Sequence, residues 1–133
     1  MRSETEAYRF TWRSSFHGDA VVRIGRQGDQ ITLRWFYRWF RRVSRDDAPP
    51  VVSLSLEDWG HLQYALIAAS FWALDTEEDP LMRGLDRAFW TIEGRTDIFR
   101  AISRWSPREA GMYGLGRLFF ELAGRPLAEL EIY

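Results

Sequence analysis

The sequence predicts an α+β fold, in which one antiparallel sheet of four or five strands carries two helices packed on one face. Apolar and polar side chains alternate in several segments, as they do in half-buried strands. Helix-start signals precede two apolar segments. The expected order is β-β-β-α-β-β-α, and such grouping of strands and helices is typical of α+β proteins. At 133 residues, 46% of them hydrophobic, the chain matches a single domain over residues 1–133 with one core.

Three strands are expected first, over Tyr8–Trp12, Ala20–Gly25 and Gln30–Arg42. Gly28-Asp29 lies between the second and third segments and is a hairpin signal. In the third segment one face is apolar, and we expect it to face the core: Ile31, Leu33, Trp35, Tyr37 and Trp39.

A helix is predicted over about Leu56–Leu74, after Val51–Leu54, which could add a little extended chain. Ser55 stands three residues before Asp58, which is a capping pattern. From Tyr64 onward the helix has almost no polar face, so we expect it to be covered on both sides or used in an interface.

A second hairpin is expected from Asp86–Glu93 and Asp97–Trp105, which flank a turn at Gly94–Thr96. The alternating Leu127–Tyr133 could add an edge strand.

The last helix is predicted over 107–123, because Ser106-Pro107 is an N-cap followed by proline at the first helical position. Glycine costs a helix about 1 kcal/mol relative to alanine, so close packing should compensate at Gly111, Gly114 and Gly116. Six side chains are expected to be buried: Trp35, Trp90, Leu66, Phe71, Leu115 and Phe119.

Composition excludes several classes of function. The 18 basic residues are balanced by 19 acidic ones, so we do not expect nucleic acid as the partner. Cysteine and lysine are absent, which excludes thiol and amine nucleophiles and disulfides. No stretch reaches the length of a membrane span, and the first 13 residues do not resemble a signal peptide. We therefore expect a cytoplasmic protein without a membrane partner.

Motifs for catalysis or metal binding are broken. Ser14, His17 and Asp19 are too close in sequence to form a triad, and a turn explains them better. Asp75-x-Glu77-x-Asp79 resembles the start of a calcium loop, but Pro80 occupies the position that needs glycine. We therefore expect no enzyme activity, no cofactor and no metal.

In one segment all charged residues are acidic, since residues 53–82 contain six Asp or Glu residues and no arginine. Four of these acids follow the expected C-terminus of a helix, where negative charge is locally unfavourable. The stability of the helix does not explain them. They could form a solvated loop with Asp79 as a helix cap, or an acidic surface that docks a basic protein. The predicted partner-binding residues are Asp75, Glu77, Glu78, Asp79 and Trp72.

Three pieces resemble a small bacterial family of unknown function: Phe71–Leu74, Gly84-Leu85-Asp86 through Trp90 to Glu93-Gly94, and Arg104–Pro107. Members of that group are similar in size and style to the immunity proteins of secreted bacterial toxins. The resemblance implies a non-enzymatic binding protein that neutralises a cognate toxin, and the acidic segment predicts that this toxin has a basic surface.

Two alternatives remain open. Arginines and aromatic residues interleave over Arg34–Arg42, as in modules that bind single-stranded nucleic acid. The apolar end of the 56–74 helix could instead form a structural homodimer. A toxin gene beside this one would favour the immunity function.

Overall fold

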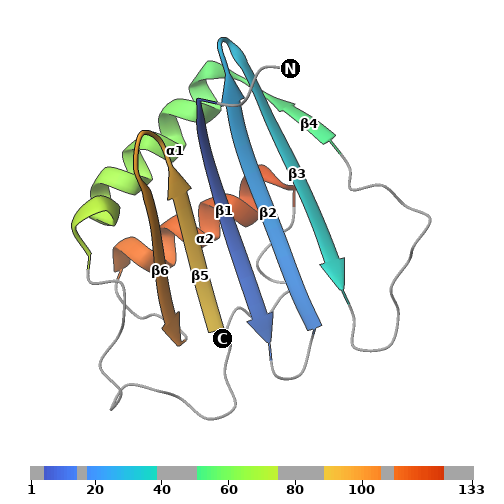
Figure 1. Cartoon of the computed structure of the whole chain (residues 1–133). Helices are drawn as coiled ribbons and strands as arrows, with labels where there is room; N and C mark the ends of the chain where they lie inside the picture. The colour runs from blue at the N-terminus through green and yellow to red at the C-terminus, as the bar shows by residue number, and fades with distance from the viewer. Residues whose placement is uncertain (1–4, 15–17, 39–50, 75–88, 106–109, 125–133) are drawn as a thin grey trace.

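The fold is α+β, with six described strands in one antiparallel sheet and two α-helices (Figure 1). A computed structural model describes residues 5–14, 18–38, 51–74, 89–105 and 110–124. The elements are, in chain order, β1 (Glu6–Ser14), β2 (Gly18–Gln27), β3 (Gln30–Arg38), β4 (Val51–Leu54), α1 (Leu56–Ala68), the 3₁₀ turn η1 (Phe71–Ala73), β5 (Phe89–Arg95), β6 (Phe99–Trp105) and α2 (Ala110–Leu122).

The strands are arranged in the order β4-β3-β2-β1-β5-β6, and all adjacent pairs are antiparallel. The first strand of the chain is therefore central. Gly28 has a φ of +59°, which favours glycine, at the tight turn between β2 and β3. The hairpin that Gly28-Asp29 predicts is confirmed.

Both helices lie on the same side of the sheet, as the view in Figure 1 shows, where the strands stand in front of them. Alternation along each strand gives the sheet an inner face against the helices. On β1 this face carries Tyr8, Phe10 and Trp12, which are almost completely buried. Phe10 packs against Trp90 and against Phe119 of α2, with ring centroids 5.1 and 5.7 Å apart.

Five of the six side chains expected in the core are buried, and Trp35 is partly buried at its margin. The prediction of close packing at the α2 glycines is confirmed at two positions. A Cβ on Gly111 would lie 2.7 Å from Cα of Ala69, and one on Gly116 would overlap the Trp90 indole. It is wrong at Gly114, which faces open space.

The predicted number of strands was too small. Val51–Leu54 pairs with β3 and forms the sixth strand. The expected edge strand at 127–133 and the far end of the third strand, 39–42, lie outside the described residues.

The strand limits also differ from the prediction at the second hairpin. Gly94 and Arg95 belong to β5, and the turn lies between Arg95 and Phe99. Residues 86–88, where that strand was expected to begin, and 106–109, at the start of the last helix, lie outside the described residues.

Helix α1 is shorter than predicted. It ends at Ala68 instead of continuing to Leu74, because Ser70 adopts a left-handed conformation with a φ of 52° that ends the helical hydrogen-bond pattern. The change of chain direction at Ser70 places Phe71 in the core. Tyr64 and Ile67 are about three-quarters exposed, so the described residues do not cover the apolar segment after Tyr64 on both sides.

Candidate functional site

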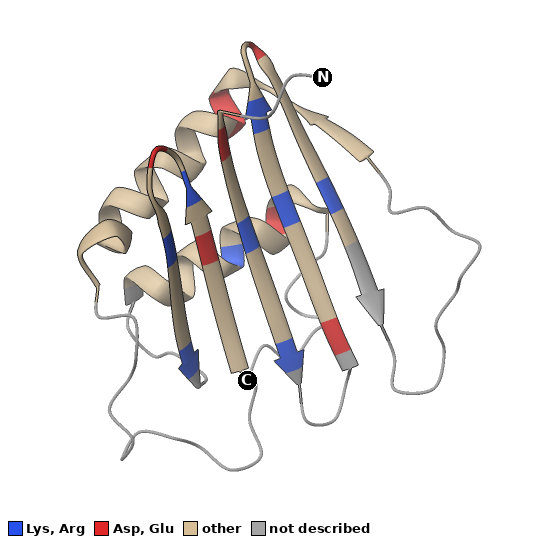
Figure 2. Ribbon diagram, in the orientation of Figure 1, with Lys and Arg blue, Asp and Glu red and all other residues tan. Residues whose placement is uncertain are grey.

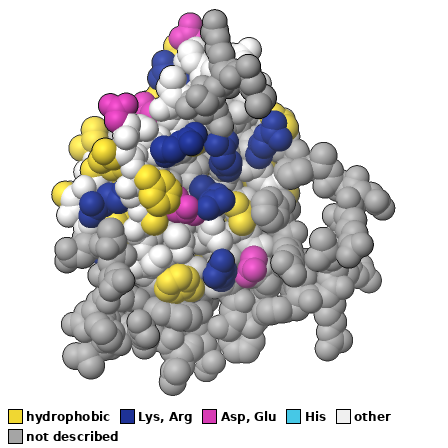
Figure 3. Space-filling model, in the orientation of Figure 1, with side chains coloured by type: hydrophobic (Ala, Val, Ile, Leu, Met, Phe, Trp, Pro, Cys, Tyr) yellow, Lys and Arg dark blue, Asp and Glu magenta, His cyan; other side chains and the backbone are white. Residues whose placement is uncertain are grey.

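The outer face of the sheet, which we call the open face, is the side away from α1 and α2 (Figures 1 and 3). It consists of the alternate residues of each strand, those that do not point toward the core. In the space-filling view basic side chains gather over the middle of this face, among a few apolar ones (Figure 3). No described helix packs on it.

Three arginines occupy directly opposite positions on neighbouring strands, and we call them the arginine row: Arg9, Arg23 and Arg34. Arg9 on β1 pairs with Arg23 on β2, and Arg23 pairs with Arg34 on β3 (Figure 2). On the other side of β1, Arg9 pairs with Glu93 of β5. This line across four strands therefore holds three positive charges and one negative charge.

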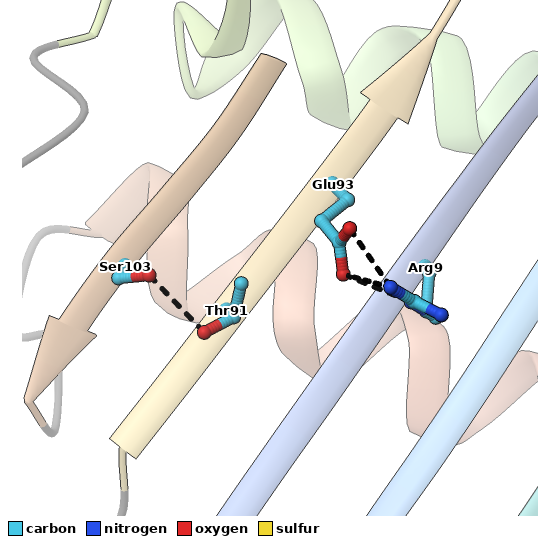
Figure 4. A network of polar contacts seen from close by, with 4 residues as sticks. All are labelled: Arg9, Thr91, Glu93 and Ser103. Carbon is cyan, nitrogen blue, oxygen red and sulfur yellow. Dashed lines mark hydrogen bonds and ion pairs between the residues drawn. The ribbon is translucent and has the colours of Figure 1, made fainter. Parts of the chain in front are cut away.

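Arg9 and Glu93 form a two-pronged ion pair (Figure 4). Nε of Arg9 donates to Oε1 of Glu93 at 2.8 Å, and Nη2 donates to Oε2 at 2.9 Å. Such paired hydrogen bonds fix the orientation of both side chains. Half of the Arg9 side chain is still exposed, against 19% of Glu93, so the guanidinium retains a solvent-facing side.

An open depression of about 410 Å³ lies in the middle of the open face. Four of its eight lining residues are arginines, namely the arginine row and Arg13. Thr11, Thr91 and Val21 also line it. Thr91 is held across the β5–β6 ladder by a 3.1 Å hydrogen bond with Ser103 (Figure 4). Hydroxyl and guanidinium groups thus surround a space that is wide enough for side chains of a partner.

Positive charge dominates the described part of the open face. Among the residues whose side chains are described, the register places five arginines and two acidic residues there: Arg9, Arg13, Arg23, Arg34, Arg95, Asp19 and Glu93. Like charges at directly opposite positions destabilise a ladder, at an energy on the order of 0.2–1 kcal/mol per pair. Arg34 and Arg23 are such a pair, since the register places them directly opposite each other.

A second, smaller depression of about 230 Å³ adjoins the first, near the β5–β6 turn. Arg95 and Phe99 are among its lining residues. The Phe99 side chain is 62% exposed, which is unusual for a phenyl ring. The open face therefore continues from a charged centre to an apolar corner.

Tyr8 lies on the opposite, inner face, and its pKa is shifted. Burial raises the pKa of Tyr8 well above its ordinary value, and the hydrogen bond to Glu6 raises it further. The phenol donates to Oε2 of Glu6 at 2.9 Å. Because its neutral form is favoured and its ring packs in the core, Tyr8 serves the fold.

The predicted acidic docking residues Asp75, Glu77, Glu78 and Asp79 lie outside the described residues, as do residues 15–17. Trp72 is described and is partly buried. Its ring packs edge-on against Phe71 and Tyr8, with centroids 5.1 and 6.4 Å apart. Trp72 thus closes the margin of the core, beside the end of α1.

Sequence analysis missed Arg9 and Arg23 as site residues and treated Arg34 as part of a local run. The position of Arg23 opposite Arg34 could have been predicted from the two-residue turn at Gly28-Asp29, because this turn fixes the β2–β3 register. Pairing of β1 with β5 joins distant segments, and no local pattern predicts it.

No protein-family model matches the sequence, and the search of curated proteins found no match. Within the described ranges, no helix combines the length and hydropathy that crossing a membrane requires. The same residues contain no group of three His, Asp or Glu placed to hold a metal ion. The open face is therefore the candidate site that the described residues offer.

Proposed function

We propose that this chain is a non-enzymatic binding protein that docks a negatively charged protein on its open face. The observation that carries the proposal is the register that places Arg34 opposite Arg23, beside the ion-paired Arg9. Like charges that face each other across a ladder repel. A partner that brings carboxylates to this face would be attracted to its arginines.

The chemistry of the face supports recognition. Guanidinium and hydroxyl groups surround the central depression, and its one lining carboxylate, Glu93, is held by Arg9. Arginine is enriched at protein interfaces because its fork of donors binds carboxylates from two sides. Raising the ionic strength should therefore weaken the complex. The association rate should depend on charge more than on the apolar area that is buried.

That the partner is a bacterial toxin remains a prediction. It is supported by a different part of the chain, the acidic segment. The acidic segment Asp75–Asp79 would dock a basic toxin, whereas the arginine row would dock an acidic protein. Replacing Asp75, Glu77, Glu78 and Asp79 by Gln in one variant, and Arg23 and Arg34 by Gln in another, separates the two surfaces. If a toxin is encoded beside this gene, its binding should be lost in the variant that alters the surface it contacts and kept in the other variant.

Single-stranded nucleic acid is a second candidate, because the three arginines of the row could neutralise successive phosphates. Modules of this type also stack bases on aromatic side chains. Around the row, however, the depression is lined by Thr11, Val21 and Thr91. A protein partner therefore fits the centre of the face better than a stacked strand does.

The proposal is tested with a bulky, uncharged substitution on the open face. Val21→Trp fills the central depression without changing the charge, and Gly114→Trp on the exposed side of α2 is a matched control. With a partner identified by cross-linking and then purified, Val21→Trp should weaken the complex at least tenfold and Gly114→Trp should not. Equal binding by both variants would place the contact elsewhere.

A further inference from the structure

We infer that the smaller depression of the open face takes an aromatic side chain of the partner, packed against the ring of Phe99 and the guanidinium of Arg95. This inference rests on the proposed function and names the group that anchors the partner on the open face. The two residues lie at the corner of the sheet where β5 turns into β6.

Phe99 and Arg95 are direct neighbours across the β5–β6 ladder. The register places them opposite each other, so their side chains leave the same face of the sheet with Cβ atoms about 4.5–5.5 Å apart. On the other side of β5, Arg95 pairs with Ala7 of β1. Because alanine has a short side chain, the surface is low beside Arg95, and the depression of about 230 Å³ is lined by all three residues.

The ring of Phe99 is exposed and lacks an aromatic neighbour. Phe99 is 62% exposed, and none of the ring contacts among the described residues involves it. In the core, by contrast, Phe10 and Trp90 pack with ring centroids 5.1 Å apart. Covering an exposed phenyl ring is favourable, and a second ring adds an offset or edge-on contact to the burial of apolar area. Phe99 therefore favours an aromatic occupant.

Arg95 is the second contact for that ring. It is exposed, and no hydrogen bond or ion pair joins its side chain to a described residue. Elsewhere in this chain the guanidinium of Arg26 lies over the ring of Trp59, 5.4 Å from the centroid. No such contact joins Arg95 to Phe99 in the described part of the chain. The guanidinium of Arg95 can therefore lie over the face of a ring that the partner supplies.

The charges around the depression favour an uncharged ring over a carboxylate. Glu93 lines the depression, and Asp97 is an exposed acid two positions after Arg95. Both would repel a carboxylate that approached Arg95, because like charges at short range repel. An aromatic ring carries no net charge and meets the cation through its electron-rich face.

The size of the depression fits one side chain. A cavity of about 150 Å³ admits benzene, so about 230 Å³ has room for a phenol or an indole. Modules for single-stranded nucleic acid stack successive bases on several aromatic side chains. Among the described lining residues only Phe99 exposes a ring, since Tyr8 is buried. A single side chain of a protein therefore fits better than successive bases do.

A small uncharged ligand tests the site. The probe is N-acetyl-tryptophan amide, and the comparison is N-acetyl-cyclohexylalanine amide, which is apolar but has no aromatic ring. In NMR spectra of the isotope-labelled full chain, the backbone signals of Ala7, Arg95 and Phe99 should shift saturably with the first ligand. Its affinity should exceed that of the second by about fivefold or more. Equal affinities, or shifts confined to other residues, would overturn the inference.

Matched variants test the two residues. Phe99→Leu keeps an apolar side chain but removes the ring, and Arg95→Gln removes the cation. Each should weaken binding of the tryptophan probe by about threefold or more. Ile98→Ala is the control, because Ile98 is 61% exposed in the same turn but does not line the depression. Circular dichroism confirms that each variant is folded. Unchanged binding by Phe99→Leu, or an equal loss with Ile98→Ala, would contradict the inference.

Three further outcomes separate this inference from its alternatives. If adenosine monophosphate binds the depression more tightly than the tryptophan probe, the corner recognises a nucleotide and the inference is wrong. If Val21→Trp weakens the complex with the purified partner while Phe99→Leu and Arg95→Gln do not, the proposed docking face stands and the aromatic anchor does not. If Val21→Trp leaves that complex intact while Phe99→Leu still loses the probe, the proposed function fails and the aromatic site stands.

Discussion

Gly116 of α2 lies against the indole ring of Trp90 on β5, so closely that a Cβ at position 116 would overlap the ring. Trp90 is completely buried, and it stacks on Tyr113 of the same helix with ring centroids 6.3 Å apart. The absence of a side chain at Gly116 is therefore what brings α2 close to the sheet.

Gly116→Ala should destabilise the protein, whereas Gly114→Ala should stabilise it. Alanine gains about 1 kcal/mol over glycine inside a helix, and nothing lies within 4 Å of a Cβ at Gly114. At Gly116 the same methyl meets Trp90, and overpacking of this kind costs about 1–3 kcal/mol. Chemical denaturation of the two variants and the parent chain measures both effects. A similar change in the free energy of unfolding for the two variants would contradict the packing described.

Arg34→Thr should leave stability unchanged or increase it by up to about 1 kcal/mol at low salt, because it removes a like charge opposite Arg23. Arg9→Thr is the matched comparison, and it should lower stability by up to about 1 kcal/mol through loss of the Glu93 ion pair. Both effects should shrink near 1 M salt, where charges are strongly screened. If Arg34→Thr proved clearly destabilising at low salt, Arg34 would be structural.

Ser55→Ala should destabilise the protein by about 1 kcal/mol. Oγ of Ser55 accepts a 3.0 Å hydrogen bond from the backbone N–H of Asp58, and Oδ2 of Asp58 accepts one from the backbone N–H of Ser55. Ser53→Ala, at an exposed position of β4, is the control. Thermal unfolding followed by circular dichroism should show a lower midpoint for Ser55→Ala alone.

Stability should fall above about pH 10 partly through Tyr8. Burial and the hydrogen bond to Glu6 raise the pKa of Tyr8 in the folded chain, whereas in the unfolded chain it is about 10. Above that pH the unfolded phenol ionises while the folded one stays neutral, so the unfolded state is favoured. Between pH 9 and 11, Tyr8→Phe should lose less of its free energy of unfolding than the parent chain does. Parallel losses would contradict the assignment.

Local sequence patterns predicted the faces of the strands and the start of α1. Period-two alternation placed Trp90 in the core, and the Ser55–Asp58 spacing marked the capping box that the structure contains. Both features depend on residues only a few positions apart. The tight turn at Gly28-Asp29 is local in the same sense.

Features that depend on distant contacts were not predicted. The apolar run after Tyr64 favours continued helix at each position, but the chain turns at Ser70, where the core accepts Phe71. The β1–β5 pairing that places Glu93 beside Arg9 joins residues 84 positions apart, and long loops leave such registers undetermined. The arginine row could therefore be found only with the sheet assembled.

The central position of β1 affects how the chain assembles during synthesis. β1 emerges from the ribosome first, but its second neighbour, β5, begins only at Phe89. At about 5–20 residues per second, roughly 4–16 s pass between the two strands. During that time one edge of β1 has exposed backbone hydrogen-bonding groups, next to Phe10 and Trp12. The nascent chain is therefore most prone to mispairing at its N-terminal strand, until the β5–β6 hairpin is made.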